Sequence, residues 1–231
     1  MEGVDYRMIF RGFTFEDRSP QHHRPKQAQF YFETNCTVYL FEQFLPNLHF
    51  TDVRSVQFEC YPNAEYACQP VIMDGLLPVT IPYDVSDFYN LSDMEKKKKT
   101  LDLLMEGLEV IYKERGWDKE PFLYAYKKVI EKNYTFKKTY KNPKSSPNRK
   151  FKAKVEIEIE LYDCTASLVV EDRDQKQLYS EVLYKKKPRF DLLYPLLGDI
   201  KWINNDEIRV HKRKPNENQF KTIHLLVDEN E

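Results

Sequence analysis

The residues best suited to chemistry are the basic side chains of residues 132–154, where nine Lys or Arg occur without an acidic residue. Phe136, Tyr140 and Phe151 lie among them. Phosphate groups attract Lys and Arg, and unpaired bases stack on aromatic rings. The stretch therefore indicates a candidate nucleic-acid-binding patch made of Lys137, Lys138, Lys141, Lys144, Arg149 and Lys150.

Other features of the basic runs favour a solvated connector instead. The whole chain has a pI of about 6.6, which is low for a nucleic-acid module. Most of the basic residues are Lys, which lacks the bidentate fork of Arg. The runs KKKK at 96–99, KKKPR at 185–189 and HKRK at 211–214 are further basic clusters. We expect Lys96–Lys99 to stay solvated in the first turns of a helix, where cations oppose the helix dipole.

Motifs for catalysis or metal binding are missing from the sequence. It contains no GxSxG, HExxH, CxxC or glycine-rich phosphate loop. His22 and His23 lie in a loop bounded by prolines, so we expect both to be solvated. His211 and His224 could approach Cys164 across neighbouring strands, but sequence cannot fix that distance. We therefore expect no catalytic residue, no metal site and no cofactor, and a protein that is not an enzyme.

Charge is distributed unevenly along the chain. Residues 1–90 carry a net charge of −6, residues 91–150 carry +7, and residues 151–231 carry −2. The four cysteines, Cys36, Cys60, Cys68 and Cys164, form no paired motif, so free buried thiols are expected. No signal peptide is visible, and no apolar run approaches the ~18 residues of a membrane helix. These features predict a cytoplasmic protein without a membrane partner.

The first block, residues 1–90, is aromatic and strand-rich. SVQFECY, at 55–61, is typical of a strand. Residues 27–44 could form strands or a short helix, because their periodicity decides for neither. The segment 71–85 contains Pro78 and Pro82, which suits an edge strand or an irregular segment.

The second block, residues 91–134, predicts a helical hairpin. Ser92 and Glu95 have the spacing of a capping box, and Gly116 stands where a left-handed residue would end the helix. Asp118 is the expected cap of a second helix, with Pro121 in its first turn. Trp117 is expected to pack in the core beside this hairpin.

The remaining residues are divided into a basic connector at 135–149 and an antiparallel sheet at 150–231. From Lys150 to Tyr162, apolar and charged residues alternate strictly, as in a half-buried strand. A hairpin is expected around Asn204 and Asn205, with Trp202 in its core. The predicted fold class is α+β, with a β-rich N-terminal block, a central αα-hairpin and a C-terminal antiparallel β-meander. The blocks could also belong to one domain.

Three segments carry a resemblance to a group of small bacterial proteins. They are LDLLMEGLEVIYKERGWDKEPFLYAYKKVIEKNY, KNPKSSPNRKFKAKVEIEIELY and LLGDIKWINNDEIRVH, within residues 92–212. Some proteins of this group are similar to immunity proteins of polymorphic toxin systems. The resemblance implies a non-enzymatic cytoplasmic protein that blocks a toxin-like partner by occlusion, and it assigns no functional residue.

If the toxin were a nuclease, the acidic residues 1–90 would complement its basic cleft and speed association. Binding of nucleic acid through residues 132–154 is the alternative function. The oligomeric state stays open.

Overall fold

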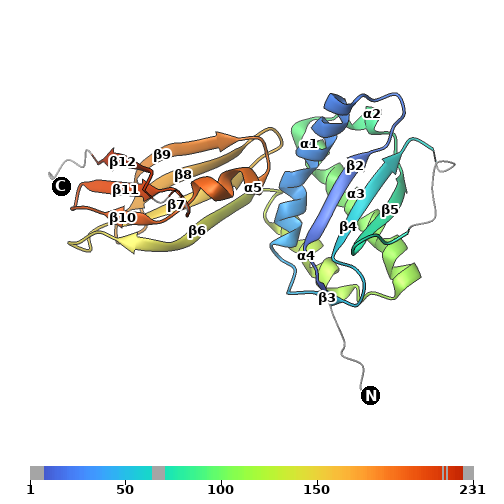
Figure 1. Cartoon of the computed structure of the whole chain (residues 1–231), viewed down its shortest axis with the longest axis horizontal. Coiled ribbons are helices and arrows are strands. Elements are labelled where there is room, and N and C mark those ends of the chain that lie inside the picture. The colour runs from blue at the N-terminus through green and yellow to red at the C-terminus, as the bar shows by residue number, and fades with distance from the viewer. Residues whose placement is uncertain (1–7, 64–70, 215, 217, 226–231) are drawn as a thin grey trace, which may run out of the picture. The chain divides into compact units, whose positions relative to one another are not determined.

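The computed structural model describes residues 8–63, 71–214, 216 and 218–225. The chain divides into two units, residues 1–136 and 137–231, here called the N-terminal and C-terminal units. Strands and helices form the first unit and antiparallel sheets dominate the second, so the predicted α+β class is confirmed (Figure 1). No helix in the described part of the chain is both long and apolar enough to cross a membrane.

A three-stranded parallel sheet forms the centre of the N-terminal unit. Its strands lie in the order β2 (Gly12–Asp17), β4 (Ser55–Tyr61) and β5 (Leu76–Pro82). β5 is an edge strand, as its prolines predicted, because Pro cannot donate a ladder hydrogen bond. Two short strands, β1 (Met8–Ile9) and β3 (His49–Phe50), pair with each other in a separate antiparallel ladder.

Helix α1 (Arg24–Glu42) connects β2 to β4 and resolves the ambiguity of residues 27–44. The run Glu33–Val38 is buried without a gap, so the helix is covered nearly all round. A helix buried on every side has little amphipathic periodicity, which explains why the pattern decided for neither structure. Pro25 lies in its first turn, where a missing N–H costs nothing.

The predicted hairpin is formed by α3 (Asp93–Arg115) and α4 (Glu120–Glu131), after the short α2 (Val85–Phe88). Both bonds of the Ser92–Glu95 capping box are present, and Gly116 adopts φ 65°. Lys119 is the N-cap of α4, while Asp118 Oδ1 accepts from the Glu120 N–H at 3.1 Å. The two helices of the predicted hairpin are therefore present, with α3 capped as expected and the N-cap of α4 at Lys119 instead of Asp118.

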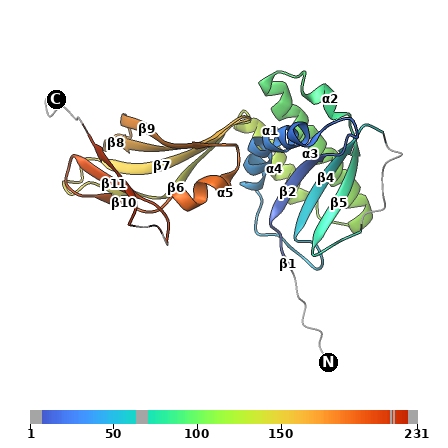
Figure 2. The same ribbon diagram turned by 45° about the horizontal axis from the view of Figure 1, so that its top comes forward.

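One face of the parallel sheet is covered by helices (Figure 2). Phe13 contacts Phe41 of α1 and Phe122 of α4, and Phe58 stacks on Phe13 with ring centroids 5.6 Å apart. Gly107 brings α3 so close to the sheet that an added Cβ would lie 2.3 Å from Phe58 Cε1. The aromatic residues of this block therefore form a shared core between sheet and helices.

The expectation that Lys96–Lys99 are solvated is wrong for the first two of these lysines, which lie in the first turns of α3. Lys96 and Lys97 are buried. Lys96 Nζ lies 2.7 Å from Glu33 Oε2, and Thr37 Oγ1 donates to the Lys97 carbonyl at 3.4 Å. Because α3 packs against α1 here, a carboxylate of α1 neutralises the lysine that the dipole alone would keep in water.

Two antiparallel sheets make up the C-terminal unit. The first has the order β6 (Phe136–Ser145), β7 (Lys152–Ile159), β8 (Cys164–Glu171) and β9 (Gln177–Lys186). The second consists of β10 (Ile200–Trp202), β11 (Glu207–His211) and β12 (Phe220–His224). The turns α5 (Phe190–Leu193) and η2 (Tyr194–Leu196) connect them. Strands consecutive in sequence are neighbours, as a meander predicts.

The basic connector expected at 135–149 is in large part a strand. Helix α4 ends at Glu131, and positive φ angles at Asn133 and Tyr134 turn the chain sharply. β6 then lies at the edge of its sheet, which can accommodate Pro143. The expectation of a connector was wrong for Phe136–Ser145, because pairing with β7 supplies hydrogen bonds that the exposed, lysine-rich pattern does not reveal.

Both tryptophans expected in the core are only half-buried. Trp117 stacks on Phe50, with ring centroids 3.6 Å apart, at the edge of the aromatic core. Trp202 donates its indole N–H to the Lys144 carbonyl at 2.8 Å, which joins β10 to β6. An indole that needs a hydrogen-bond partner is often placed at such a boundary, with one side apolar and the other side wet.

The burial of the described cysteines agrees with the expectation, whereas the burial of His22 does not. Cys36, Cys60 and Cys164 are free and buried, as expected, and Cys68 lies outside the described residues. His23 is exposed, but His22 is buried, contrary to the expectation of a solvated pair. Its ring contacts Asp17, five positions earlier, and Ser86, 64 positions later, and the proline-bounded loop gave no sign of these contacts.

Candidate functional site

A basic cavity of about 550 Å³ opens in the C-terminal unit. Its walls come from β6, the loop before β10, β10 itself, and the segment that follows β11. We call it the basic cavity. It is lined by Lys141, Gly198, Asp199, Lys201, His211, Lys212, Arg213, Lys214 and Asn218.

Hydrogen bonds to backbone carbonyls hold the wall of the basic cavity in place. Tyr140 donates its hydroxyl to the Leu197 carbonyl at 2.9 Å, which fastens β6 to the loop before β10. The N–H of Gly198 donates to the His211 carbonyl at 2.8 Å. A Cβ at Gly198 would lie 2.3 Å from the Lys212 carbonyl oxygen, so only glycine fits this approach. The cationic side chains are therefore carried on a fixed frame.

Positive charge dominates the lining of the basic cavity. Its five Lys and Arg residues face one carboxylate, that of Asp199, which pairs with Lys141 Nζ at 2.6 Å. The hydrogen bond from Lys141, with the nearby charges of Lys144 and Lys201, lowers the pKa of Asp199 below its ordinary value. One carboxylate cannot neutralise five cations, so the cavity favours an anion.

Aromatic rings accompany these cations. The Arg213 guanidinium lies 3.8 Å from the centroid of the Tyr194 ring. On β12, Phe220 is 48% exposed, and its ring centroid lies 5.3 Å from that of His211, a lining residue. Such a combination of cations with accessible aromatic faces suits a ligand that has both phosphates and bases.

The six residues of the predicted basic patch do not form one site. Lys141 lines the basic cavity, and Lys144 lines the small hollow beside it with Asp199. Lys137 is instead paired with Glu156 of β7 at 2.9 Å. Lys138 is exposed on β6, and Arg149 and Lys150 are exposed in the turn before β7. Two of the six residues, Lys141 and Lys144, therefore lie at the cavity or at the hollow beside it.

Most of the cavity's cations were missed as site residues. Lys201 is an isolated lysine in a short strand, and nothing in its neighbourhood distinguishes it. Lys212, Arg213 and Lys214 were visible as the basic run 211–214, which was a real signal. Sequence could not show that this run faces Lys141, which lies some seventy residues earlier and on another sheet.

No model of a protein family matches the sequence, and comparison with curated proteins and with solved structures gives no significant match. The chain is therefore classified by its own structure, as an α+β protein with one parallel-sheet unit and one antiparallel unit.

Proposed function

We propose that this chain is a binding protein whose C-terminal unit binds single-stranded nucleic acid in the basic cavity. The observation that carries the proposal is the set of five Lys and Arg residues around one volume with one carboxylate. Each cation that meets a phosphate releases a counterion, so such a cavity gains affinity from the nucleic-acid backbone.

The exposed aromatic rings support single strands over a duplex. Phe220 and Tyr194 are 48% and 39% exposed. Unpaired bases can stack on such rings, each stacked base contributing roughly 1–3 kcal/mol, whereas the bases of a duplex are already stacked. Lysines serve as point charges for phosphate, so we expect little sequence preference.

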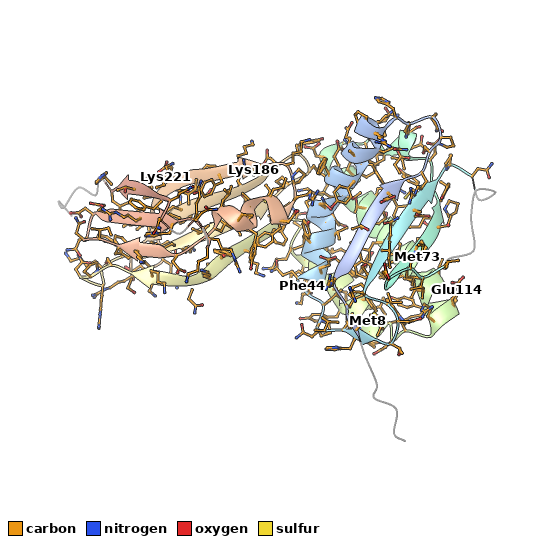
Figure 3. The ribbon with its side chains drawn as sticks, in the orientation of Figure 1. Met8, Phe44, Met73, Glu114, Lys186 and Lys221 are labelled. Atoms are coloured by element: carbon orange, nitrogen blue, oxygen red, sulfur yellow. The ribbon has the colours of Figure 1, made fainter. Side chains whose placement is uncertain are left out.

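Fluorescence anisotropy with a labelled 20-nucleotide single strand tests the proposal at several salt concentrations. Replacing Lys201, Arg213 and Lys214 together by alanine should weaken binding at least tenfold. It should also reduce the slope of log affinity against log salt by about 2, since each single-strand phosphate contact contributes roughly 0.7. Lys176→Ala with Lys186→Ala is the control, because both lysines are exposed on the same unit and neither lines the cavity. Lys186 is labelled in Figure 3. Equal loss in both variants would contradict the proposal.

A second candidate is a cytoplasmic immunity-like protein that neutralises a toxin-like partner by occlusion. The N-terminal unit supports it, because residues 1–136 carry a net charge of −5 whereas residues 137–231 carry +4. An acidic surface would be attracted to the basic cleft of a nuclease. Co-expression with the protein encoded beside it tests this candidate, which predicts rescue from toxicity and a salt-sensitive complex. Neither function requires the protein to carry out chemistry.

A further inference from the structure

A chain of two hydrogen bonds joins Asp17, His22 and Ser86 in the N-terminal unit. Asp17 Oδ2 lies 2.6 Å from His22 Nδ1, and His22 Nε2 lies 3.1 Å from Ser86 Oγ. A carboxylate on one ring nitrogen holds the proton there, which leaves the other nitrogen free to accept a proton from the serine hydroxyl.

These three residues meet at the carboxyl edge of the parallel sheet. Asp17 is the last residue of β2, His22 lies in the turn before α1, and Ser86 follows β5 in α2. Figure 1 shows α2 and the start of α1 at the end toward which the strands of this sheet point. Open α/β sheets place their sites at this edge, because strand ends and helix starts converge there.

The orienting groups are fixed more firmly than the serine. The side chains of Asp17 and His22 are 0% and 3% exposed. Asp17 Oδ1 accepts from the Ser19 N–H at 2.9 Å, which holds the carboxylate. The ring of Tyr89 lies edge-on to His22, with centroids 5.7 Å apart, and limits the tilt of the imidazole.

Ser86 is placed differently from its two partners. It is partly exposed, and its N–H donates to Asp84 Oδ1 at 2.9 Å, which fixes its backbone. Burial therefore decreases from Asp17 and His22 to Ser86. This order suits a nucleophilic serine, since only the serine must reach a substrate.

We propose that Ser86 is an activated nucleophile that hydrolyses carboxylic esters, with His22 as its general base and Asp17 as the residue that positions His22. Ser86 Oγ bonds to the carbonyl carbon while its proton passes to His22 Nε2. The ester C–O bond then breaks, and the alcohol leaves with that proton. Water next attacks the acyl-serine, gives a proton to His22, and releases the carboxylic acid as the Ser86 hydroxyl re-forms.

This inference runs against the sequence-based expectation that the chain is not an enzyme. It concerns the N-terminal unit and does not depend on the basic cavity. Asp17, His22 and Ser86 are 5 and 64 positions apart in sequence, and no short motif connects them.

Two measurements on the full chain test the serine site. The first is the intact mass and peptide map after treatment with diisopropyl fluorophosphate, and the second is the hydrolysis rate of p-nitrophenyl acetate. We expect one adduct, on Ser86. His22→Gln and Asp17→Asn should each slow hydrolysis roughly 100-fold or more, the loss typical for removal of general-base assistance. Ser180→Ala, at an exposed serine of the other unit, should change neither result. An unlabelled Ser86, or equal labelling of Ser86 and Ser180, overturns the proposal.

A cysteine variant separates nucleophile activation from an effect on folding. Ser86→Cys should react with iodoacetamide at least tenfold faster than Ser180→Cys, because His22 can take the thiol proton. Adding His22→Gln to Ser86→Cys should remove that advantage. Equal rates for the two cysteines, under conditions where circular dichroism shows both variants folded, also overturn the proposal.

Discussion

One ion pair from each unit shows two extremes of burial. In the N-terminal unit, Glu33 pairs with Lys96, and their side chains are 3% and 7% exposed. In the C-terminal unit, Lys185 pairs with Asp163 at the surface, where the lysine side chain is 65% exposed. Charges that are buried must be paired and become part of the fold, whereas charges at the surface stay available to a ligand.

The largest expected loss of stability comes from breaking the buried ion pair of Lys96 and Glu33. Lys96→Met keeps an unbranched side chain that is one atom shorter, but leaves Glu33 buried without its cation. Removal of one partner of a buried pair typically costs about 3–5 kcal/mol, because the remaining charge is desolvated and uncompensated. Urea unfolding followed by circular dichroism measures the loss.

The exposed pair of the C-terminal unit provides the control for this experiment. Lys185→Met should cost less than about 1 kcal/mol, since water screens such a pair. If the two substitutions had equal effects on the free energy of unfolding, the contrast between the two pairs would be wrong.

Local signals in the sequence were sufficient for much of this fold. The capping box at Ser92, the left-handed Gly116 and the alternation of β7 each depend on residues within a few positions of one another. Local patterns failed where burial came from distant partners. Helix α1 is buried without a gap over Glu33–Val38, and β6 is an edge strand whose mostly exposed residues show no alternation.

The candidate site shows the same limit. Lys141 was found because it lies in a basic stretch, but Lys201 could not be recognised as its neighbour. His22 resembled a solvated loop residue, because Ser86, which its ring contacts, lies 64 positions away. The cations of the cavity come from separate segments of the chain, so no spacing in the sequence indicates that they lie together.

An intermediate change in the free energy of unfolding is expected from the titration of Glu42 in α1. Glu42 Oε1 accepts from the Phe13 N–H at 2.6 Å, and an added Cβ at Gly12 would lie 2.1 Å from this oxygen. Although Glu42 as a residue is only half-buried, burial of its carboxylate against this backbone raises its pKa to about 8, and the hydrogen bond from Phe13 offsets only part of the rise.

The folded state therefore binds a proton at Glu42 more tightly than the unfolded state does. Its contribution to stability is complete below the unfolded pKa of about 4.5 and is lost as pH rises toward 8. Glu42→Gln keeps an acceptor for Phe13 and cannot ionise. We expect it to be more stable than the natural chain by about 2 kcal/mol at pH 9, with no difference at pH 4.5. Parallel pH profiles of the two proteins would contradict this account.

The smallest change in stability is expected from Glu156 of β7. Its pKa is lowered by folding, whereas that of Glu42 is raised. Partial burial tends to raise the pKa of Glu156, but hydrogen bonds from Lys137 and Lys154 outweigh it and lower the pKa. The folded state then binds the proton less tightly, so the stabilisation is present above the unfolded pKa of about 4.5 and is lost as the pH falls through the lower folded value.

Glu156→Gln should therefore cost less than about 1 kcal/mol at pH 7, and this difference should disappear in acid. Thermal unfolding between pH 3 and pH 7 measures it. A cost that persisted at pH 3 would mean that packing, and not charge, holds Glu156 in place. The opposite pH responses of Glu42 and Glu156 would then no longer distinguish a carboxylate buried without a cation from one that is paired with two lysines.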